Sequence, residues 1–121
     1  MNKQENLYGD VLLQQCPSRE ILNHLTGRWA VLVFVCLYQE THRFSQLKYR
    51  ITGISEKMLS QTLRELESDG FVHREVFPEV PPRVEYSLTP LGREASVRLL
   101  ELVHWIEHSL PAIRQAQGDR A

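Results

Sequence analysis

The spacing of apolar positions along the chain predicts a mainly helical protein. In residues 18–25, Ile21, Leu22 and Leu25 fall on one side of a short helix. Residues 28–38 are apolar in every direction of a helical wheel. A helix that is apolar all round is buried, so this segment is predicted to be the central helix, enclosed by the others.

The middle of the chain predicts two more helices joined by a tight turn. Phe44, Leu47 and Ile51 share one face of a short helix. Residues 41–43 before it break the helical pattern and have room for one short strand. Residues 52–54 form the tight link to the next helix, so the two helices are a candidate helix-turn-helix.

The sequence GISEKMLSQTLRELESDG, residues 53–70, carries the start and stop signals of a helix. Ser55 is a natural N-cap, and Gly70 is a natural residue just after the last turn. The apolar stripe of this helix consists of Leu59, Leu63 and Leu66. The polar side chains on the opposite face are Lys57, Gln61, Arg64 and Ser68. This polar face is a candidate for contact with another molecule.

Past the end of this helix, the spacing changes from helical to alternating. Val84, Tyr86 and Leu88 alternate with polar residues, which is typical of a half-buried strand, and residues 71–77 can form its partner. Prolines fill the link at residues 78–82. Because proline cannot donate to a strand ladder, they mark the loop of a hairpin.

The last predicted helix begins at Thr89 and Pro90, which suit the cap and the first helical position. Pro111 is expected to end or kink it. Its main apolar stripe is Leu91, Ala95, Leu99, Leu102, Val103, Ile106 and Leu110. Further apolar side chains lie off this stripe, namely Val97, Leu100 and Trp105. Such additional apolar surface predicts a second partner, here the other subunit of a dimer.

The order of these elements predicts a mainly α fold with a small β-hairpin. Two short helices joined by a tight turn and followed directly by a hairpin form a winged helix-turn-helix. The polar face of its second helix then suits the DNA major groove, which is wide enough for an α-helix. The expected organisation is an N-terminal arm (1–15), a winged helix-turn-helix domain (16–110) that includes a dimerisation helix (90–110), and a C-terminal tail (111–121).

Local charge supports a DNA partner, although the whole chain is nearly neutral. The 121 residues have the composition of one globular domain and a net charge of -1. Between residues 43 and 64 the only acid is Glu56. The cations of this segment, which are candidate DNA contacts, are Arg43, Lys48, Arg50, Lys57 and Arg64. The alternative is a solvated polar face on a winged-helix protein-interaction module that does not bind DNA.

Several long motifs carry a resemblance to a known family. They are CPSREIL, the apolar helix led by TGRW, HRFSQLKYRITGISEKMLSQTLRELESDGFV, and EVFPEVPPRVEYSLTPLG. In this order, over residues 16–105, they resemble the HxlR family of bacterial winged-helix regulators. The resemblance implies a homodimer on double-stranded DNA, with two recognition helices in successive major grooves and dimerisation through flanking N- and C-terminal helices. It also implies control of neighbouring genes.

The resemblance also implies site residues by position. DNA contacts are expected from the exposed start and outer face of the recognition helix and from a basic residue beside the wing tip. These residues are Ser55, Lys57, Met58, Ser60, Gln61, Arg64 and Arg83. Glu56 stands where many relatives have proline, which alters the helix start only slightly. The expected dimer interface includes Leu99, Leu100, Val103, Trp105, Ile106 and Leu110.

Two cysteines lie in a chain whose N-terminus shows no export signal, which favours reduced thiols in the cytoplasm. Cys36, inside the all-apolar helix, is expected in the core. Cys16 has two interpretations, a small buried hydrophobic residue or a thiol sensor. The resemblance supports the sensor, because several members respond to oxidants, quinones or aldehydes through a cysteine at this position. An oxidant or another small molecule would then be the effector.

The segment from His104 to His108 fits H-x-x-E-H, a zinc-protease motif with histidines at i and i+4. A catalytic zinc needs a third protein ligand and a substrate cleft, which this short chain does not suggest. We therefore expect no enzymatic activity, metal or cofactor. The longest apolar run, residues 29–38, is shorter than the roughly 20 residues of a membrane span, so no membrane partner is expected.

Overall fold

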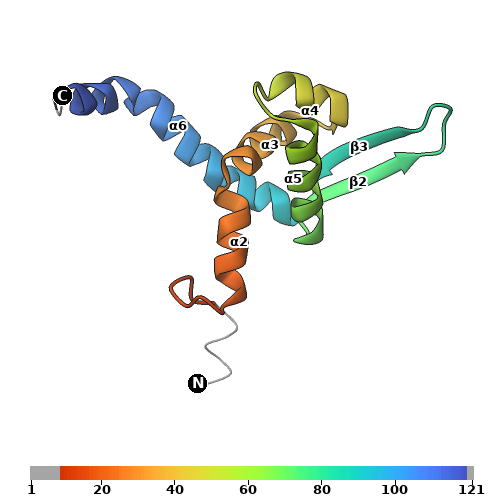
Figure 1. Ribbon diagram of the computed structural model, residues 1–121, viewed down its shortest axis with the longest axis horizontal. Coiled ribbons are helices and arrows are strands. Elements are labelled where there is room, and N and C mark those ends of the chain that lie inside the picture. The colour runs from red at the N-terminus through yellow and green to blue at the C-terminus, as the bar shows by residue number, and fades with distance from the viewer. Residues whose placement is uncertain (1–8, 120–121) are drawn as a thin grey trace.

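A computed structural model describes residues 9–119 of the chain. The helices are α2 (Pro17–Thr26), α3 (Arg28–Gln39), α4 (Phe44–Arg50), α5 (Glu56–Ser68) and α6 (Pro90–Gly118). The strands are β1 (His42–Arg43), β2 (Val72–Phe77) and β3 (Arg83–Leu88). The predicted mainly α fold with a small hairpin is confirmed. The β2–β3 hairpin and the far end of α6 project from opposite sides of the helical body (Figure 1).

The strands form one antiparallel sheet in the order β1-β3-β2. Tyr86 at the middle of β3 pairs with Arg74 of β2 on one side and with His42 of β1 on the other. The hairpin is thus the predicted one, and β1 is the short strand that the sequence allowed within residues 41–43. Since side chains alternate across a sheet, this register decides which residues of the hairpin share a face.

The helix α3 lies at the centre of the core, as its all-round apolar pattern predicts. It contacts α2, α4, α5, α6 and β3, and the ring of its Phe34 meets that of Phe71 edge-on, with centroids 6.2 Å apart. The expectation that the other elements enclose it was wrong in part. Leu32 and Tyr38 are 39% and 37% exposed, although the guanidinium of Arg93 in α6 lies over the ring of Tyr38, 5.1 Å from its centroid.

The helix α5, the predicted recognition helix, begins and ends at the cap residues that the sequence predicts. The Ser55 hydroxyl accepts a hydrogen bond from the N–H of Met58 at 3.0 Å, and the chain leaves α5 through Gly70 with φ of +88°. Positive φ costs glycine little, which is why it suits this position. The Thr89 hydroxyl donates to the Gly70 carbonyl at 2.6 Å and accepts from the N–H of Gly92 at 3.0 Å. Thr89 therefore joins the end of α5 to the start of α6.

Gly92 permits an unusually close crossing at the start of α6. A Cβ atom at this position would lie 1.9 Å from the carbonyl oxygen of Phe71, which is backbone and cannot rotate away. The N–H of Thr89 also donates to this oxygen, at 3.1 Å. The start of α6 therefore packs directly on the chain segment that enters β2.

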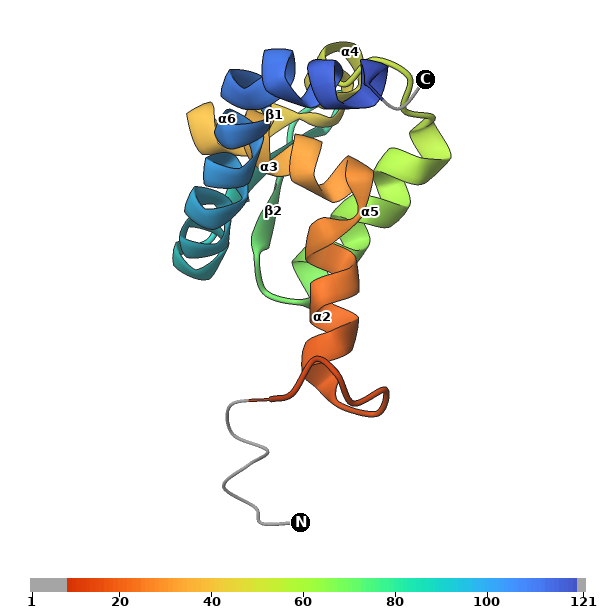
Figure 2. The same ribbon diagram turned by 90° about the vertical axis from the view of Figure 1, so that its left-hand side faces the viewer.

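The helix α6 continues past Pro111 to Gly118. It therefore does not end at residue 110, and most of the segment expected to be a separate C-terminal tail is helical. A proline inside a helix removes one N–H donor but leaves the remaining hydrogen bonds to hold the helix together. The alternative outcome, a kink, agrees with Figures 1 and 2, where the last part of α6 runs in a different direction from its start.

Candidate nucleic-acid interface

The exposed face of α5 has the arrangement that its sequence predicts. Leu59, Leu63 and Leu66 are at most 2% exposed and fix this helix on the core. The side chains predicted to face outward are exposed, apart from Ser60, which is half-buried: Ser55, Lys57, Met58, Ser60, Gln61 and Arg64. A rigid amphipathic helix therefore presents a row of polar side chains to solvent. This is the geometry required to read a major groove.

The charges of α5 separate along its length. Among the described residues, neither Lys57 nor Arg64 has a carboxylate close enough for an ion pair. The acids gather toward the C-terminal end, where Glu65 accepts a 3.3 Å hydrogen bond from the amide of Gln61. Gln61 would exchange this internal bond for one to a base. The helix can therefore offer unpaired positive charge beside an amide able to read bases.

A buried histidine of β1, His42, holds Arg50 of α4, one of the predicted cations. His42 is 3% exposed, and its Nδ1 lies 2.8 Å from the carbonyl oxygen of Glu40. Because a carbonyl only accepts, Nδ1 carries the hydrogen, and Nε2 accepts from Nη1 of Arg50 at 2.9 Å. Neutral His42 thus orients Arg50. Sequence reasoning assigned His42 no role, because its hydrogen bond to Arg50 joins two separate elements, β1 and α4, and leaves no periodic pattern in the sequence.

The two remaining cations of this segment are Arg43 in β1 and Lys48 in α4. Arg43 is exposed at the N-cap of α4, and its N–H donates to Oε1 of Gln46 at 2.8 Å. Lys48 is half-buried. Their contact with DNA stays a prediction.

Arg83 on the wing is held by its own hairpin. Its Nη2 lies 3.2 Å from Glu79 and its Nη1 lies 3.6 Å from Glu85. The guanidinium also stacks over the ring of Phe77, with 4.0 Å between its central carbon and the ring centroid. Two carboxylates therefore offset the charge of the residue that the resemblance places beside the wing tip. Its contact with DNA stays a prediction.

A groove lies between the C-terminal half of α5 and the hairpin. Its volume is ≈ 360 Å³, and it combines two arginines with one acid. Its lining residues are Ser60, Leu63, Arg64, Glu67, Arg74 and Tyr86. Arg74 was missed by sequence reasoning, which treated residues 71–77 only as a strand. The available signal was a cation on the same side of the strand as buried Val72.

Cys16 lies at the N-cap position of α2 and is half-buried. Its Sγ is 3.1 Å from the Ser18 hydroxyl and accepts from the N–H of Asp10 at 3.2 Å. The hydrogen bond with the Ser18 side chain, followed by that from Asp10, lowers the pKa of the Cys16 thiol. Burial instead raises the pKa of the Cys36 thiol in the core. Only Cys16 thus combines access with a stabilised thiolate.

Gly9 allows the N-terminal loop to form this thiol environment. It has φ of +73°, and a Cβ there would lie 2.8 Å from Cβ of Ser18. The loop therefore folds closely over the start of α2 and brings the N–H of Asp10 to the sulfur.

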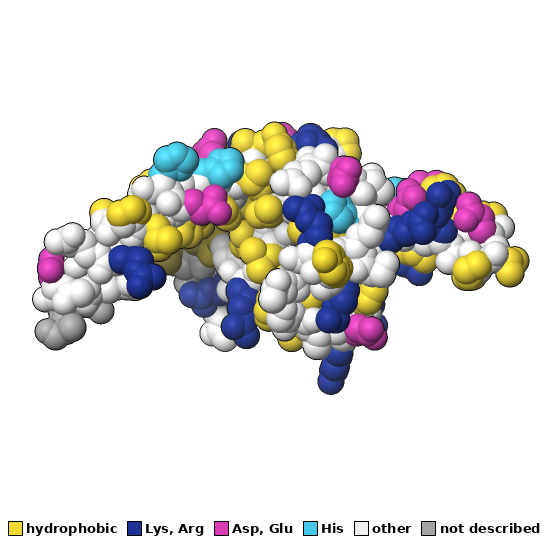
Figure 3. Space-filling model, turned by 90° about the horizontal axis from the view of Figure 1, so that it is seen from above, with side chains coloured by type: hydrophobic (Ala, Val, Ile, Leu, Met, Phe, Trp, Pro, Cys, Tyr) yellow, Lys and Arg dark blue, Asp and Glu magenta, His cyan; other side chains and the backbone are white. Residues whose placement is uncertain are grey.

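The residues predicted for the dimer interface form a half-exposed apolar surface on α6. Leu99, Leu100 and Val103 are half-buried, while Trp105, Ile106 and Leu110 are 60%, 42% and 46% exposed. Hydrophobic side chains continue from the body along the projecting end of α6 (Figure 3). Leu22 on α2 is also exposed. The pairing of subunits through this surface stays a prediction.

The histidine motif of α6 is exposed. Nδ1 of His108 lies 3.1 Å from the carbonyl oxygen of His104. Within residues 9–119, no group of three or more His, Cys, Asp or Glu side chains is placed to hold a metal ion. In the same part of the chain, no single helix is both long and apolar enough to cross a membrane.

Comparison with known proteins agrees with the resemblance. Residues 24–114 match the family described as HxlR-like helix-turn-helix. The HTH-type transcriptional regulator YtfH of Escherichia coli (strain K12) is 52% identical over 113 residues, covering 93% of this chain and 90% of that protein.

Solved structures give the same result. The transcriptional regulator ytfH from Salmonella typhimurium has a TM-score of 0.87 at 51% identity, covering 91% of this chain and 98% of that chain. The redox regulator HypR, in its oxidized form, has a TM-score of 0.71 at 40% identity, covering 77% of this chain and 96% of that chain. The chain belongs to the HxlR-like helix-turn-helix family and is a winged helix-turn-helix transcriptional regulator.

Proposed function

We propose that this regulator binds double-stranded DNA as a cytoplasmic homodimer and reads its operator through the exposed face of α5. The observation that carries the proposal is the pair of cations Lys57 and Arg64, which lack an acidic partner among the described residues and lie opposite a buried leucine stripe. Phosphate contacts position such a helix, and contacts to base edges give it specificity. No enzymatic step is part of the proposal.

The roles divide by side-chain chemistry. Phosphate contacts are assigned to the cations and base contacts to the amide and hydroxyl groups of α5. The proposed phosphate-binding set is Arg43, Lys48, Arg50, Lys57 and Arg64. The proposed base-reading set is Ser55, Ser60 and Gln61, with Met58 beside them as an apolar contact. Two copies of α5 related by a two-fold axis would then read two half-sites about one helical turn apart.

We also propose that modification of Cys16 controls DNA binding. Its lowered pKa and its position at the start of α2 support this, as does the similarity to HypR, a redox regulator. An oxidant or electrophile of low molecular mass would be the effector. An adduct at the start of α2 would disturb the loop from Gly9 that packs on this helix.

The testing experiment selects bound fragments from random DNA and then measures affinity for the selected site over a series of salt concentrations. Wild-type protein should bind one two-fold site, and Lys57→Ala should weaken binding to all sequences and lower the salt slope by about 2 per dimer, one for each subunit. Arg98→Ala, which removes an exposed cation of α6, is the matched control and should leave the slope unchanged. Binding without sequence preference, or equal effects of both variants, would contradict the proposal.

A further inference from the structure

The hairpin carries two arginines in different electrostatic settings. Arg83 lies between Glu79 and Glu85, whereas Arg74 has no carboxylate within ion-pair distance among residues 9–119. A cation that already has two acidic partners must leave them to bind phosphate, and those acids also repel the incoming charge. Arg74 has no ion-pair partner to leave among the described residues.

Strand register places these two arginines on opposite faces of the hairpin. Arg74 pairs with Tyr86, and Glu75 with Glu85 in the next position. Because side chains alternate, Arg83, Glu85 and Glu75 share the face opposite to that of Arg74. The face of Arg74 is the one that also carries buried Val72 and Tyr86 and packs toward α5.

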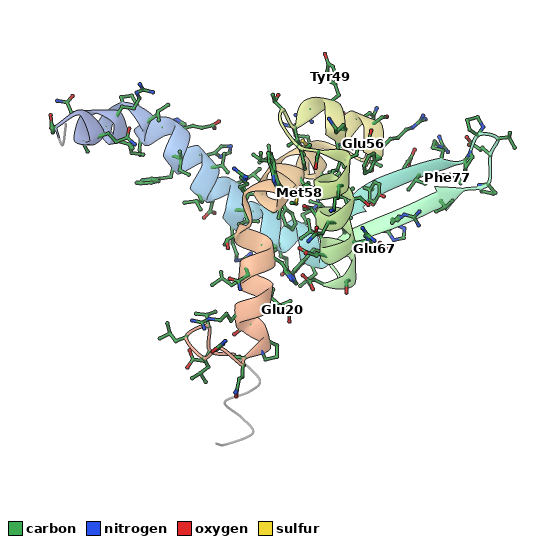
Figure 4. The ribbon with its side chains drawn as sticks, viewed as in Figure 1. Glu20, Tyr49, Glu56, Met58, Glu67 and Phe77 are labelled. Atoms are coloured by element: carbon green, nitrogen blue, oxygen red, sulfur yellow. The ribbon has the colours of Figure 1, made fainter. Side chains whose placement is uncertain are left out.

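Arg74 therefore lies across a groove from Arg64 of α5. The floor of this groove includes Tyr86, which is 9% exposed, and the groove has a volume of ≈ 360 Å³. When a helix occupies the major groove, the sugar-phosphate strand that borders this groove runs alongside the helix. The hairpin lies beside α5 (Figure 4), so it can meet such a strand. Both guanidinium groups can bind phosphate oxygens of such a strand.

We propose that Arg64 and Arg74 together bind one strand of the DNA backbone, and that Arg74, not Arg83, is the main phosphate contact of the wing. The inference rests on the proposed function and adds a residue to it. It also assigns a role to Glu67, the acid that lines the groove and lies near the base of the hairpin (Figure 4). Glu67 repels the backbone and so limits the affinity for DNA of any sequence.

The test compares variants on the selected operator and on an unrelated duplex, with affinity measured by fluorescence anisotropy over a salt series. Arg74→Ala should weaken binding to both duplexes and reduce the salt slope by about 2 per dimer, because each of the two subunits loses one phosphate contact. Arg74→Lys keeps the positive charge and should restore most of the slope. Arg83→Ala, on the same hairpin, is the comparison variant and should lower the slope less than Arg74→Ala does, whereas Arg98→Ala on α6 is the control that should leave the slope unchanged.

Glu67→Gln provides an independent arm of opposite sign. It should tighten binding to both duplexes several-fold at moderate salt, because repulsion between the carboxylate and phosphate is removed. Thermal unfolding is measured for each variant, to check that the fold is kept when the exposed side chain is replaced.

The outcomes separate this inference from the proposed function. If wild-type protein shows no salt-dependent DNA binding, the proposed function fails. If Lys57→Ala weakens binding while Arg74→Ala does not, or if Arg83→Ala alone lowers the slope, the proposed function stands and the inference about Arg74 is overturned. An unchanged affinity of Glu67→Gln would overturn the assignment of Glu67.

Discussion

His24 and Asp69 join the first described helix to the end of the recognition helix. Nδ1 of His24 lies 2.6 Å from Oδ2 of Asp69, although the two residues are 45 positions apart in the sequence. His24 is in the last turn of α2, and Asp69 is the C-cap of α5. Their side chains are only 21% and 12% exposed. The helix that starts beside Cys16 is thus linked directly to the helix proposed to read DNA.

The first prediction concerns the pH dependence of this link. The hydrogen bond to Asp69, helped by the charges of Glu65 and Glu20, raises the pKa of His24 above its ordinary 6.5. A raised folded-state pKa means that the stabilisation is fully present below the unfolded-state pKa and is lost as the pH rises through the folded-state pKa. The free energy of unfolding should therefore exceed that of His24→Gln by about 1 kcal/mol at acidic pH, and less above neutrality.

Urea unfolding of both proteins at several pH values checks this prediction. His104→Gln, which removes an exposed histidine of α6, is the control and should follow the wild type across the series. A stability difference between wild type and His24→Gln that stays constant with pH would show that His24 contributes through packing alone.

The second prediction concerns Gly92. In Gly92→Ala the new Cβ would lie 1.9 Å from the Phe71 carbonyl oxygen, so α6 or the start of β2 must shift. We expect a loss of about 3 kcal/mol in unfolding free energy, at the upper end of overpacking effects. Gly118→Ala has no neighbouring atom within 4 Å and serves as the control. Thermal or urea unfolding measures both variants. Equal unfolding midpoints for Gly92→Ala and Gly118→Ala would contradict the close crossing of α6 and the Phe71 backbone.

The third prediction concerns base preference. Gln61→Ala removes the exposed amide of α5 and should relax the preferred sequence, with a loss of about 1–3 kcal/mol of discrimination at one position in each half-site. Competition binding with single-base variants of the selected operator measures this. Ser68→Ala alters another polar residue near the end of the same helix and should preserve the preference. If all base substitutions rank as in the wild type, Gln61 does not read a base.

The fourth prediction concerns the thiols. Cys16 should react with a thiol reagent in the native protein, whereas Cys36 should react only on unfolding, because it is 5% exposed. Ser18→Ala removes the main hydrogen bond that lowers the pKa of Cys16, so the labelling rate at neutral pH should fall several-fold. Mass spectrometry of each cysteine-containing peptide over time gives both rates.

DNA binding supplies the functional arm of this experiment. Treatment with an electrophile or peroxide should weaken binding by the wild type but not by Cys16→Ser. If Cys16 stays unlabelled until the protein unfolds, the thiol hypothesis is wrong and any effector must bind without covalent chemistry.

The fifth prediction concerns assembly. Ile106 is 42% exposed in the single chain, so Ile106→Glu should leave the subunit folded and convert a dimer to a monomer at micromolar concentration. Light scattering gives the mass, and circular dichroism gives the fold. Glu94→Ala, at another exposed position of α6, is the control. A dimer that survives Ile106→Glu would place the subunit contact elsewhere.

Features with a local cause could be predicted from the sequence. The caps at Ser55 and Thr89, the turn at Gly70 and the leucine stripe of α5 each depend on residues within a few positions of one another. The alternation in β3 likewise fixed the hairpin. These signals were sufficient for the order of elements and for the outward face of the recognition helix.

Features that depend on distant pairing could not be predicted in this way. The pairs His24–Asp69 and Arg50–His42 form only when separate elements meet. The same holds for the groove that brings Arg74 beside α5. The sequence also left open whether Pro111 ends or kinks α6; in the structure the remaining helical hydrogen bonds outweigh the one that proline removes, and the helix continues to Gly118.

The contact between Gly92 and the backbone of Phe71 has a consequence for regulation. This contact and the hydrogen bond from the Thr89 hydroxyl to the Gly70 carbonyl leave the recognition helix, the wing and the start of α6 little freedom to move separately. We therefore expect each subunit to bind DNA as one rigid unit. A signal would then act on the distance and tilt between the DNA-binding units of the two subunits. Regulation would change which half-site spacing is accepted, while the bases preferred within each half-site stay the same.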